Sequence, residues 1–96
     1  MGIDEVLKGK REEILRLAAK RGVCNVRVFG SFARGDARPD SDVDFLVSLQ
    51  SGRTLLDAGG LLMDLQQLLG RSVHVVTDKS LHQFIRERVM AEARPV

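Results

Sequence analysis

Two aspartates separated by one residue, Asp42 and Asp44, are the residues best placed to do chemistry. They lie in a run that alternates like a strand, so both side chains leave the same face, ~6.6 Å apart along the backbone. Two carboxylates on one face resist burial unless a divalent cation lies between them or water reaches both. Mg²⁺ prefers oxygen ligands, and two such ions can clamp a phosphoryl transfer. The pair predicts a Mg²⁺ site, although Asp-x-Asp alone often marks an exposed edge strand.

A phosphate-binding turn is predicted upstream, where Gly30 and Ser31 follow a strand and precede the aspartate pair by ten residues. A glycine lets the backbone approach a ligand closely, and the amides and hydroxyl that follow can donate to phosphate oxygens. Arg34 could neutralise phosphate charge. Alone, Gly-Ser is more often a simple turn and an arginine a solvated surface residue. In this order and spacing, all five residues predict a nucleotide site.

The helices and strands that must position these residues are predicted from the sequence pattern. Apolar residues at helical spacing indicate helices, and alternating polar and apolar residues or β-branched runs indicate strands. In chain order they are a helix over 3–21, strands over 25–29 and 42–49, a helix over 55–69, a strand over 73–77, and a helix from a capping box at Ser80 and Gln83 to about Ala93. Gly22 and Gly70 are typical helix stops, while Gly9 weakens the first helix. The order α-β-β-α-β-α predicts a small α/β sandwich around a sheet of three or more strands.

Length and charge limit the function classes. The 96 residues leave room for one domain, 1–96, and 44% hydrophobic residues predict a folded core. A formal net charge of +2, with acids interspersed among the basic residues, provides no clustered basic face. Four Phe without Trp or Tyr are a poor base-stacking platform, so no direct nucleic-acid binding is expected.

The cellular compartment is predicted from features that the sequence lacks, namely paired cysteines, a signal peptide and a membrane span. The lone Cys24 can form neither an intrachain disulfide nor a thiolate metal cluster, which fits a reducing compartment. The first residues lack the basic stretch and apolar run of a signal peptide, and no apolar segment approaches the ~20 residues of a membrane span. We expect a cytoplasmic protein without a membrane partner.

The motif resembles a known family. Gly30-Ser31, ten residues and then Asp42-Val43-Asp44 is the signature of the DNA polymerase β-like nucleotidyltransferase superfamily. The fuller string Gly-Ser-x-Ala-Arg-Gly followed by Ser-Asp-x-Asp is similar to its minimal nucleotidyltransferase (MNT) branch. The close match spans about Val26 to Val47, and the rest agrees more loosely in length and element order.

The resemblance implies a mixed central sheet, a nucleoside triphosphate (ATP) bound with Mg²⁺, and transfer of the nucleotidyl group to a hydroxyl with release of pyrophosphate. Carried over by position, Gly30 and Ser31 hold the triphosphate, while Asp42 and Asp44 bind the metals. Arg34 lies within the motif without an assigned role. The usual partner in the MNT branch is a HEPN-domain protein, often a ribonuclease toxin, which the MNT antitoxin silences by adenylylating a tyrosine. A homo- or hetero-oligomer is therefore expected.

One departure from the family concerns its third carboxylate, which is usually on a later strand and activates the attacking hydroxyl. The residue at that place here is His74. An imidazole can ligate a metal or accept a proton, but Mg²⁺ favours oxygen ligands, so the catalytic ion should be held more weakly. In an extended strand, Asp78 would point to the same face as His74, but it would lie ~13 Å further along the chain.

Three functions remain open from the sequence. The first is an ATP-using protein adenylyltransferase that acts as antitoxin on a HEPN toxin, with His74 as a competent substitute for the third carboxylate. The second is a catalytically impaired binding module that neutralises its partner by covering it, which His74 favours. The third is a small-molecule nucleotidyltransferase of the antibiotic-modifying kind, although the chain supplies no separate acceptor pocket.

Overall fold

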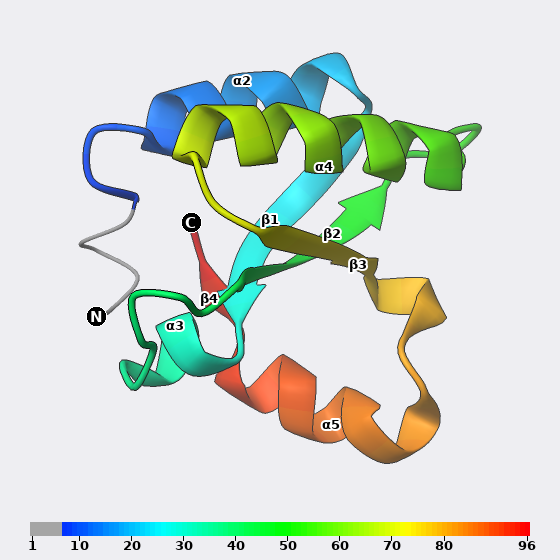
Figure 1. Ribbon diagram of the computed structural model, residues 1–96. Helices are drawn as coiled ribbons and strands as arrows, with labels where there is room; N and C mark the ends of the chain where they lie inside the picture. The colour runs from blue at the N-terminus through cyan, green and yellow to red at the C-terminus, as the bar shows by residue number, and fades with distance from the viewer. Residues whose placement is uncertain (1–6) are drawn as a thin grey trace.

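A four-stranded sheet lies at the centre of the computed structural model, which describes residues 7–96 (Figure 1). The elements are α2 (Arg11–Lys20), β1 (Val23–Phe29), α3 (Ser31–Arg34), β2 (Val43–Leu49), α4 (Leu55–Leu69), β3 (Val73–Thr77), the 3-10 helix η1 (Asp78–Ser80), α5 (Gln83–Glu92) and β4 (Arg94–Pro95). The strand order is β3-β2-β1-β4, with β2 parallel to β3 and antiparallel to β1. The sheet is mixed, as the family resemblance implies, and the α/β fold class is confirmed.

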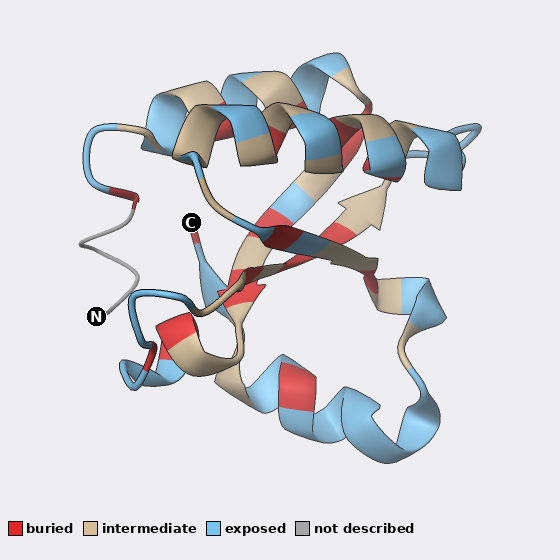
Figure 2. Ribbon diagram, in the orientation of Figure 1, coloured by how far each residue is buried: buried red, intermediate tan, exposed pale blue. Residues whose placement is uncertain are grey.

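The main core lies between one face of the sheet and the helices α2 and α4 (Figures 1 and 2). Alternate residues of β2 point into it, and Val43, Phe45 and Val47 are at most 1% exposed. The helices contribute buried residues at helical spacing, namely Ile14 and Ala18 from α2 and Leu61 and Leu65 from α4. This packing leaves the opposite face of β2 available for polar side chains.

An ion pair joins the two core helices at their exposed edge. The guanidinium of Arg21 donates from Nε to Oδ2 of Asp64 at 3.0 Å and from Nη2 to Oδ1 at 3.3 Å. Gly60 makes room for this contact, because a Cβ there would lie 2.4 Å from Nη1 of Arg21. A glycine within a helix is thus explained by a side chain that crosses above it.

The predictions for α4 and β3 match the structure at both ends. The start of α4 is fixed by Thr54, whose Oγ1 accepts from the amide of Leu56 and whose own amide donates to Asp57 Oδ2. The helix ends at Gly70, which adopts a φ of +65°. Leu55 is nevertheless exposed, since the buried stripe of the helix begins one turn later.

Two elements were missed by the sequence analysis. The segment after Gly30, predicted as a turn, winds into the single helical turn α3. At the other end of the chain, Arg94 and Pro95 pair with Val28 and Arg27 of β1 as the edge strand β4. Proline has no N–H to donate to a neighbouring strand, so it is confined to positions such as this edge, where no further strand needs that donor.

The predicted capping box at Ser80 and Gln83 is wrong. Ser80 ends η1, where its hydroxyl bonds to the carbonyl and hydroxyl of Thr77. The residue that caps α5 is His82, whose Nδ1 accepts from the amide of Phe84 at 3.3 Å. Local hydrogen bonds at the end of β3 therefore hold Ser80 in η1, and the helix begins at Gln83, two residues later than a cap at Ser80 predicts.

The first helix and strand differ from prediction in their starts. Helix α2 begins at Arg11, after Gly9 with a φ of +75°, while residues 3–6 of the predicted helix lie outside the described residues. Strand β1 begins two residues early, at Val23, and contains a register shift where Asn25 has a φ of +50°. Within residues 7–96, no helix is long and apolar enough to cross a membrane.

Candidate active site on the open face of β2

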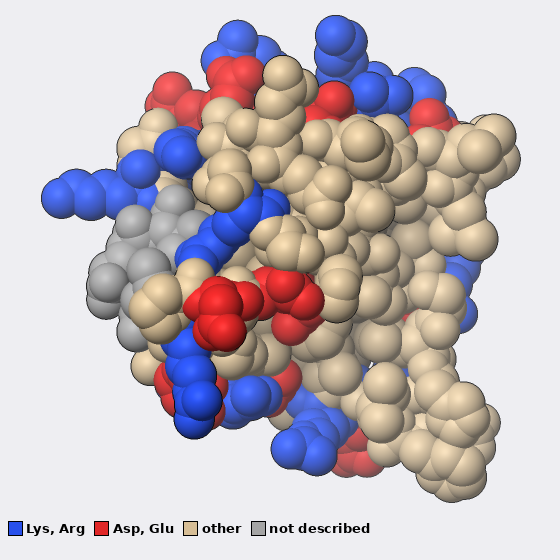
Figure 3. Space-filling view, viewed as in Figure 1, with Lys and Arg blue, Asp and Glu red and all other residues tan. Residues whose placement is uncertain are grey.

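Asp42 and Asp44 both lie on the side of β2 that faces away from the main core. Asp44 is part of the strand, and its side chain is 25% exposed. Asp42 immediately precedes the strand and is more exposed. Figure 3 shows acidic side chains gathered over the start of β2, with basic side chains around them. The two carboxylates are therefore reachable by a ligand.

His74 lies between the two aspartates. Because β3 runs parallel to β2, the register places His74 opposite Asp44. Its Nδ1 is 3.3 Å from Oδ1 of Asp44, and its Nε2 is 3.4 Å from Oδ2 of Asp42. The imidazole thus contacts both predicted metal ligands, while Asp78 lies beyond β3, where its carboxylate accepts from Ser48.

The electrostatics of Asp44 favour a cation. Burial raises the pKa of the Asp44 carboxyl above its ordinary value, and the nearby charge of Asp42 raises it further. Contacts with His74 lower this pKa and only partly offset the burial. A cation at the two carboxylates would relieve the cost of holding negative charge on this face.

Gly30 brings the turn after β1 against Asp44. It has a φ of +76° and a ψ of −152°, a conformation that is open essentially to glycine alone. A Cβ at this position would lie 2.5 Å from Oδ2 of Asp44. The register of β1 and β2 explains the approach, because Phe29 pairs with Asp44. Ser31 follows as the first residue of α3 and is half-buried.

Arg34 ends α3 and points back to the same turn. Its Nε donates to Asp36 Oδ2 at 3.3 Å, and its Nη1 donates to Glu92 Oε2 at 3.3 Å. Hydrogen bonds to Asp36 and then to Glu92 raise the pKa of this already basic guanidinium. The group is fully charged and partly exposed, as a phosphate partner must be.

Glu92 is the site residue that the sequence analysis missed. It is the last residue of α5, and its Oε1 accepts from the Gly30 amide at 2.9 Å. The two residues are 62 positions apart in the chain. They meet because the pairing of β4 with β1 returns the end of the chain to this turn. No local pattern around Glu92 indicates that contact.

The two aspartates suit Mg²⁺ if oxygen atoms of the substrate supply further ligands. In the part of the chain that the structure describes, no three His, Cys, Asp or Glu side chains are arranged to hold a metal ion on their own. Asp42 and Asp44 offer two hard carboxylates on an accessible face, and proteins commonly bind Mg²⁺ through one or two carboxylates together with substrate phosphates.

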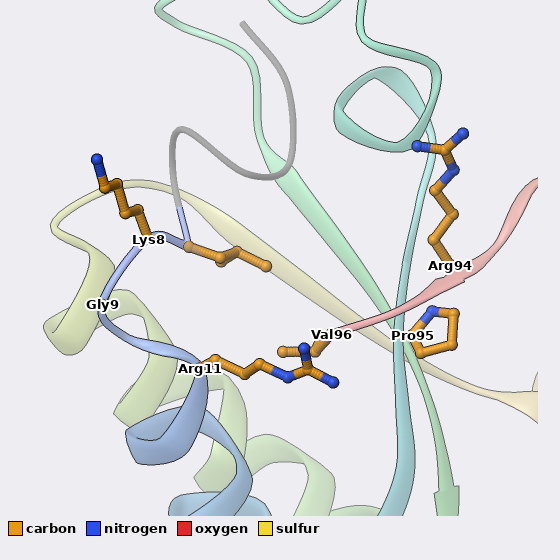
Figure 4. Close-up of a pocket in the computed structure, with 7 residues that line it drawn as sticks. Lys8, Gly9, Arg11, Arg94, Pro95 and Val96 are labelled. Carbon is orange, nitrogen blue, oxygen red and sulfur yellow. The ribbon is translucent and has the colours of Figure 1, made fainter.

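A separate cavity lies away from these residues. It has a volume of about 450 Å³ and is lined by the segment Leu7–Gly9, by Arg11 and by the segment Arg94–Val96 (Figure 4). None of the predicted site residues lines it. The candidate site is instead defined by groups that converge on an open surface.

Comparison with known proteins identifies the family. A family model described as "Nucleotidyltransferase domain" matches residues 8–96. Protein adenylyltransferase MntA of Thermococcus cleftensis is 38% identical over 90 residues, which cover 94% of this chain and 88% of the relative. A solved structure, provisionally described as a minimal nucleotidyltransferase, is 48% identical with a TM-score of 0.87 and covers 100% of this chain and 97% of its own.

A more distant structure shares the fold. It is a toxin–antitoxin complex solved with AMP-PNP, 19% identical with a TM-score of 0.75, and the match covers 90% of this chain and 71% of that one. The family model and the MntA relative both extend over nearly the whole sequence, so the prediction of a nucleotidyltransferase enzyme is confirmed. The chain belongs to the nucleotidyltransferase domain family, as the spacing of its glycine-serine turn and aspartate pair predicts.

Proposed function

We propose that this protein is a Mg²⁺-dependent, ATP-using protein adenylyltransferase that acts as the antitoxin of a HEPN-domain toxin. The observation that carries this proposal is the convergence of three kinds of group on one face. Gly30 offers a backbone amide, Arg34 a guanidinium, and Asp44 a carboxylate against which Gly30 packs. Phosphate oxygens need the first two groups, and the metal ions that accompany a triphosphate need the third.

Each residue has a role in the proposed transfer. The Gly30 amide and the Ser31 hydroxyl hold the triphosphate, while Arg34 neutralises its charge. Asp42 and Asp44 would hold Mg²⁺, which when bound supplies charge neutralisation and a template for the in-line displacement. The acceptor oxygen forms a bond to the α-phosphorus, the bond to the bridging oxygen breaks, and pyrophosphate leaves. His74, between the two aspartates, can accept the proton of the attacking hydroxyl.

The toxin partner is supported by the relatives. MntA of Thermococcus cleftensis is named a protein adenylyltransferase, and a protein of the same fold was solved in a toxin–antitoxin complex with AMP-PNP. We propose the same arrangement here, with a tyrosine hydroxyl of the HEPN toxin as acceptor. A lone Cys24 and an ATP substrate both favour the cytoplasm as the compartment.

The docking surface that we propose for the toxin is the apolar part of α5. Phe84, Ile85 and Met90 are exposed large hydrophobic residues on this helix. The same helix ends at Glu92, which contacts Gly30 and Arg34 of the site. A partner that covers α5 therefore lies beside the nucleotide, where its hydroxyl can reach the α-phosphorus. Exposed apolar surface of this kind typically marks an interaction site.

One observation favours a second function, a binding module without transfer activity. The imidazole of His74 lies within 3.4 Å of both Asp42 and Asp44, so it competes for carboxylate oxygens that a metal ion would use. Such a module would neutralise the toxin by covering its surface. A His74→Asp variant separates the two functions, because it restores a third carboxylate. A large gain in transfer rate would favour the module, whereas equal and easily measured rates in both forms would favour the enzyme.

The decisive experiment is the intact mass of the toxin. The toxin is incubated with Mg-ATP and wild-type protein, with the Asp44→Asn variant as the matched control. We expect the toxin to gain one adenylyl group only with the wild-type protein. A stable complex without added mass would contradict the enzymatic proposal and leave the binding module.

A further inference from the structure

A single carboxylate, that of Glu92, is bound to two of the three groups to which the proposed function assigns phosphate binding, the Gly30 amide and the Arg34 guanidinium. Glu92 Oε1 lies 2.9 Å from the Gly30 amide nitrogen and 3.4 Å from Arg34 Nη1. Its Oε2 lies 3.3 Å from the same Nη1. The side chain is only 21% exposed, so the contact is partly shielded from water. A carboxylate that bridges a backbone amide and an arginine resembles a phosphate in charge and in acceptor geometry.

The contact excludes a phosphate from the same donors. Gly30 has one amide hydrogen, and that hydrogen already points to Glu92. A phosphate oxygen brought to this amide would meet the carboxylate at hydrogen-bond distance, and the two negative charges would repel each other. Binding of the triphosphate therefore requires the Glu92 side chain to leave.

We propose that Glu92 is a gate, a built-in acidic competitor that holds the phosphate position of the site until a nucleotide displaces it. This inference rests on the proposed function, since it takes Gly30 and Arg34 as the phosphate donors. It adds a residue from the end of α5 that the glycine-serine and aspartate motif does not contain. It also sets a threshold, because a ligand must offer more negative charge than one carboxylate to open the site.

The surroundings of Glu92 allow it to move. It is the last residue of α5, and Val89 is the buried residue of that helix. Arg34 would keep a second carboxylate partner, because Asp36 lies 3.3 Å from its Nε. Rotation of the Glu92 side chain thus leaves the guanidinium charge compensated and the main core undisturbed. The energy lost is that of two charge-assisted contacts, to the Gly30 amide and to Arg34, both of which a triphosphate can replace.

The test is a calorimetric titration of Mg-ATP into wild-type protein and two gate variants, Glu92→Gln and Glu92→Ala. Glutamine keeps the shape and an acceptor oxygen but removes the charge, whereas alanine removes both. We expect the dissociation constant to fall about tenfold in Glu92→Ala and by a smaller factor in Glu92→Gln, because the nucleotide no longer displaces a charged competitor.

Two control variants isolate the gate from general charge effects. Asp36→Asn removes a carboxylate from Arg34 without touching the Gly30 amide, and we expect at most about a twofold change, as for an exposed ion pair. Glu87→Gln removes the same charge from an exposed part of α5, and we expect no change.

Each outcome decides the inference. Tighter binding that is specific to the Glu92 variants supports the gate. Equal tightening in Glu87→Gln would assign the effect to net charge and overturn it. If wild-type protein binds Mg-ATP but the Glu92 variants bind it equally or more weakly, Glu92 positions the turn instead, and the proposed function survives. If none of the five proteins binds Mg-ATP, the proposed function fails and the gate with it.

Discussion

The two faces of β2 carry opposite chemistry on one strand. Val43, Phe45 and Val47 point to the main core and are at most 1% exposed. The alternate positions hold Asp44 and Ser48, and Asp42 continues the same side beyond the end of the strand. Leu46 is the buried exception on that side. Because the side-chain period of a strand is two, seven residues can both anchor the fold and present its site.

The helices that cover the two faces differ in the same way. On the core side, α2 buries two apolar residues and α4 buries three (Figure 2). The Arg21–Asp64 ion pair ties the two helices together. On the site side, Val89 is the one buried residue of α5. Stability is thus concentrated on one side of the sheet, while the other side is free to bind ligands and partners. Four variants test this division.

The largest effect is expected from Phe45→Ala, which empties a fully buried position on the core face. The free energy of unfolding should fall by about 3–5 kcal/mol, a large part of the stability of a small domain. Denaturant unfolding measures the change, and Phe45→Leu should lose much less because it fills most of the volume. A small loss from Phe45→Ala would mean that the core face does not carry the fold.

Asp44→Asn should have the reverse effect of Phe45→Ala, a large loss of activity without a loss of stability. Transfer of the adenylyl group should fall to about 1% of wild type or less, because a metal ligand is lost. The melting temperature should stay the same or rise slightly, since burial already raises the pKa of this carboxyl and disfavours its charged form. Thermal unfolding and an adenylylation assay check both parts. A lower melting temperature would show that the site face also stabilises the fold.

Gly30→Ala tests the contact between the turn and Asp44. We expect a loss of about 1–3 kcal/mol in stability and weaker Mg-ATP binding, because the added Cβ both strains the backbone and displaces the Asp44 carboxylate. Gly35→Ala is the matched control: its φ is +84°, but a Cβ there meets nothing within 4 Å. Equal loss of Mg-ATP affinity in both variants, measured by calorimetry, would remove the special role of Gly30.

The smallest effect concerns the surfaces of the covering helices. Phe84→Asp on α5 should weaken the complex with the toxin about tenfold without lowering the melting temperature, since Phe84 is 84% exposed. Leu56→Asp on α4 changes an equally exposed residue, at 86%, on the other side of the sheet and should leave the complex unchanged. A pull-down titration compares them. If Leu56→Asp is the more damaging variant, the toxin docks on the core-side helices.

The elements that could be predicted from the sequence are those with strong local signals. Helix α4 has a leucine stripe ended by Gly70, and β3 is a β-branched run, so both were located to the residue. Asp42, Asp44 and Gly30 could be singled out because their spacing is a local motif. His74 could be singled out because the family usually has its third carboxylate on a later strand.

The features that escaped prediction depend on contacts between distant segments. Strand β4 has two residues and forms only because β1 offers a free edge. The turn α3 buries Phe32 and Ala33 against the rest of the fold. The late start of α5, at Gln83, is the exception, because local bonds to Thr77 hold Ser80 in η1. Glu92 reaches the site through that β4 pairing, so its contact with Gly30 has no signal in the sequence around it.

The central claim is that the open face of β2 holds a metal-bound nucleotide, and a titration of Mg-ATP into Asp42→Asn tests it most directly. Asp42 precedes the strand and is partly exposed, so the substitution leaves the core intact. We predict that wild-type protein binds Mg-ATP, and that Asp42→Asn loses metal-dependent binding at an unchanged melting temperature. An unaltered affinity in the variant would contradict the assignment of the site to this face.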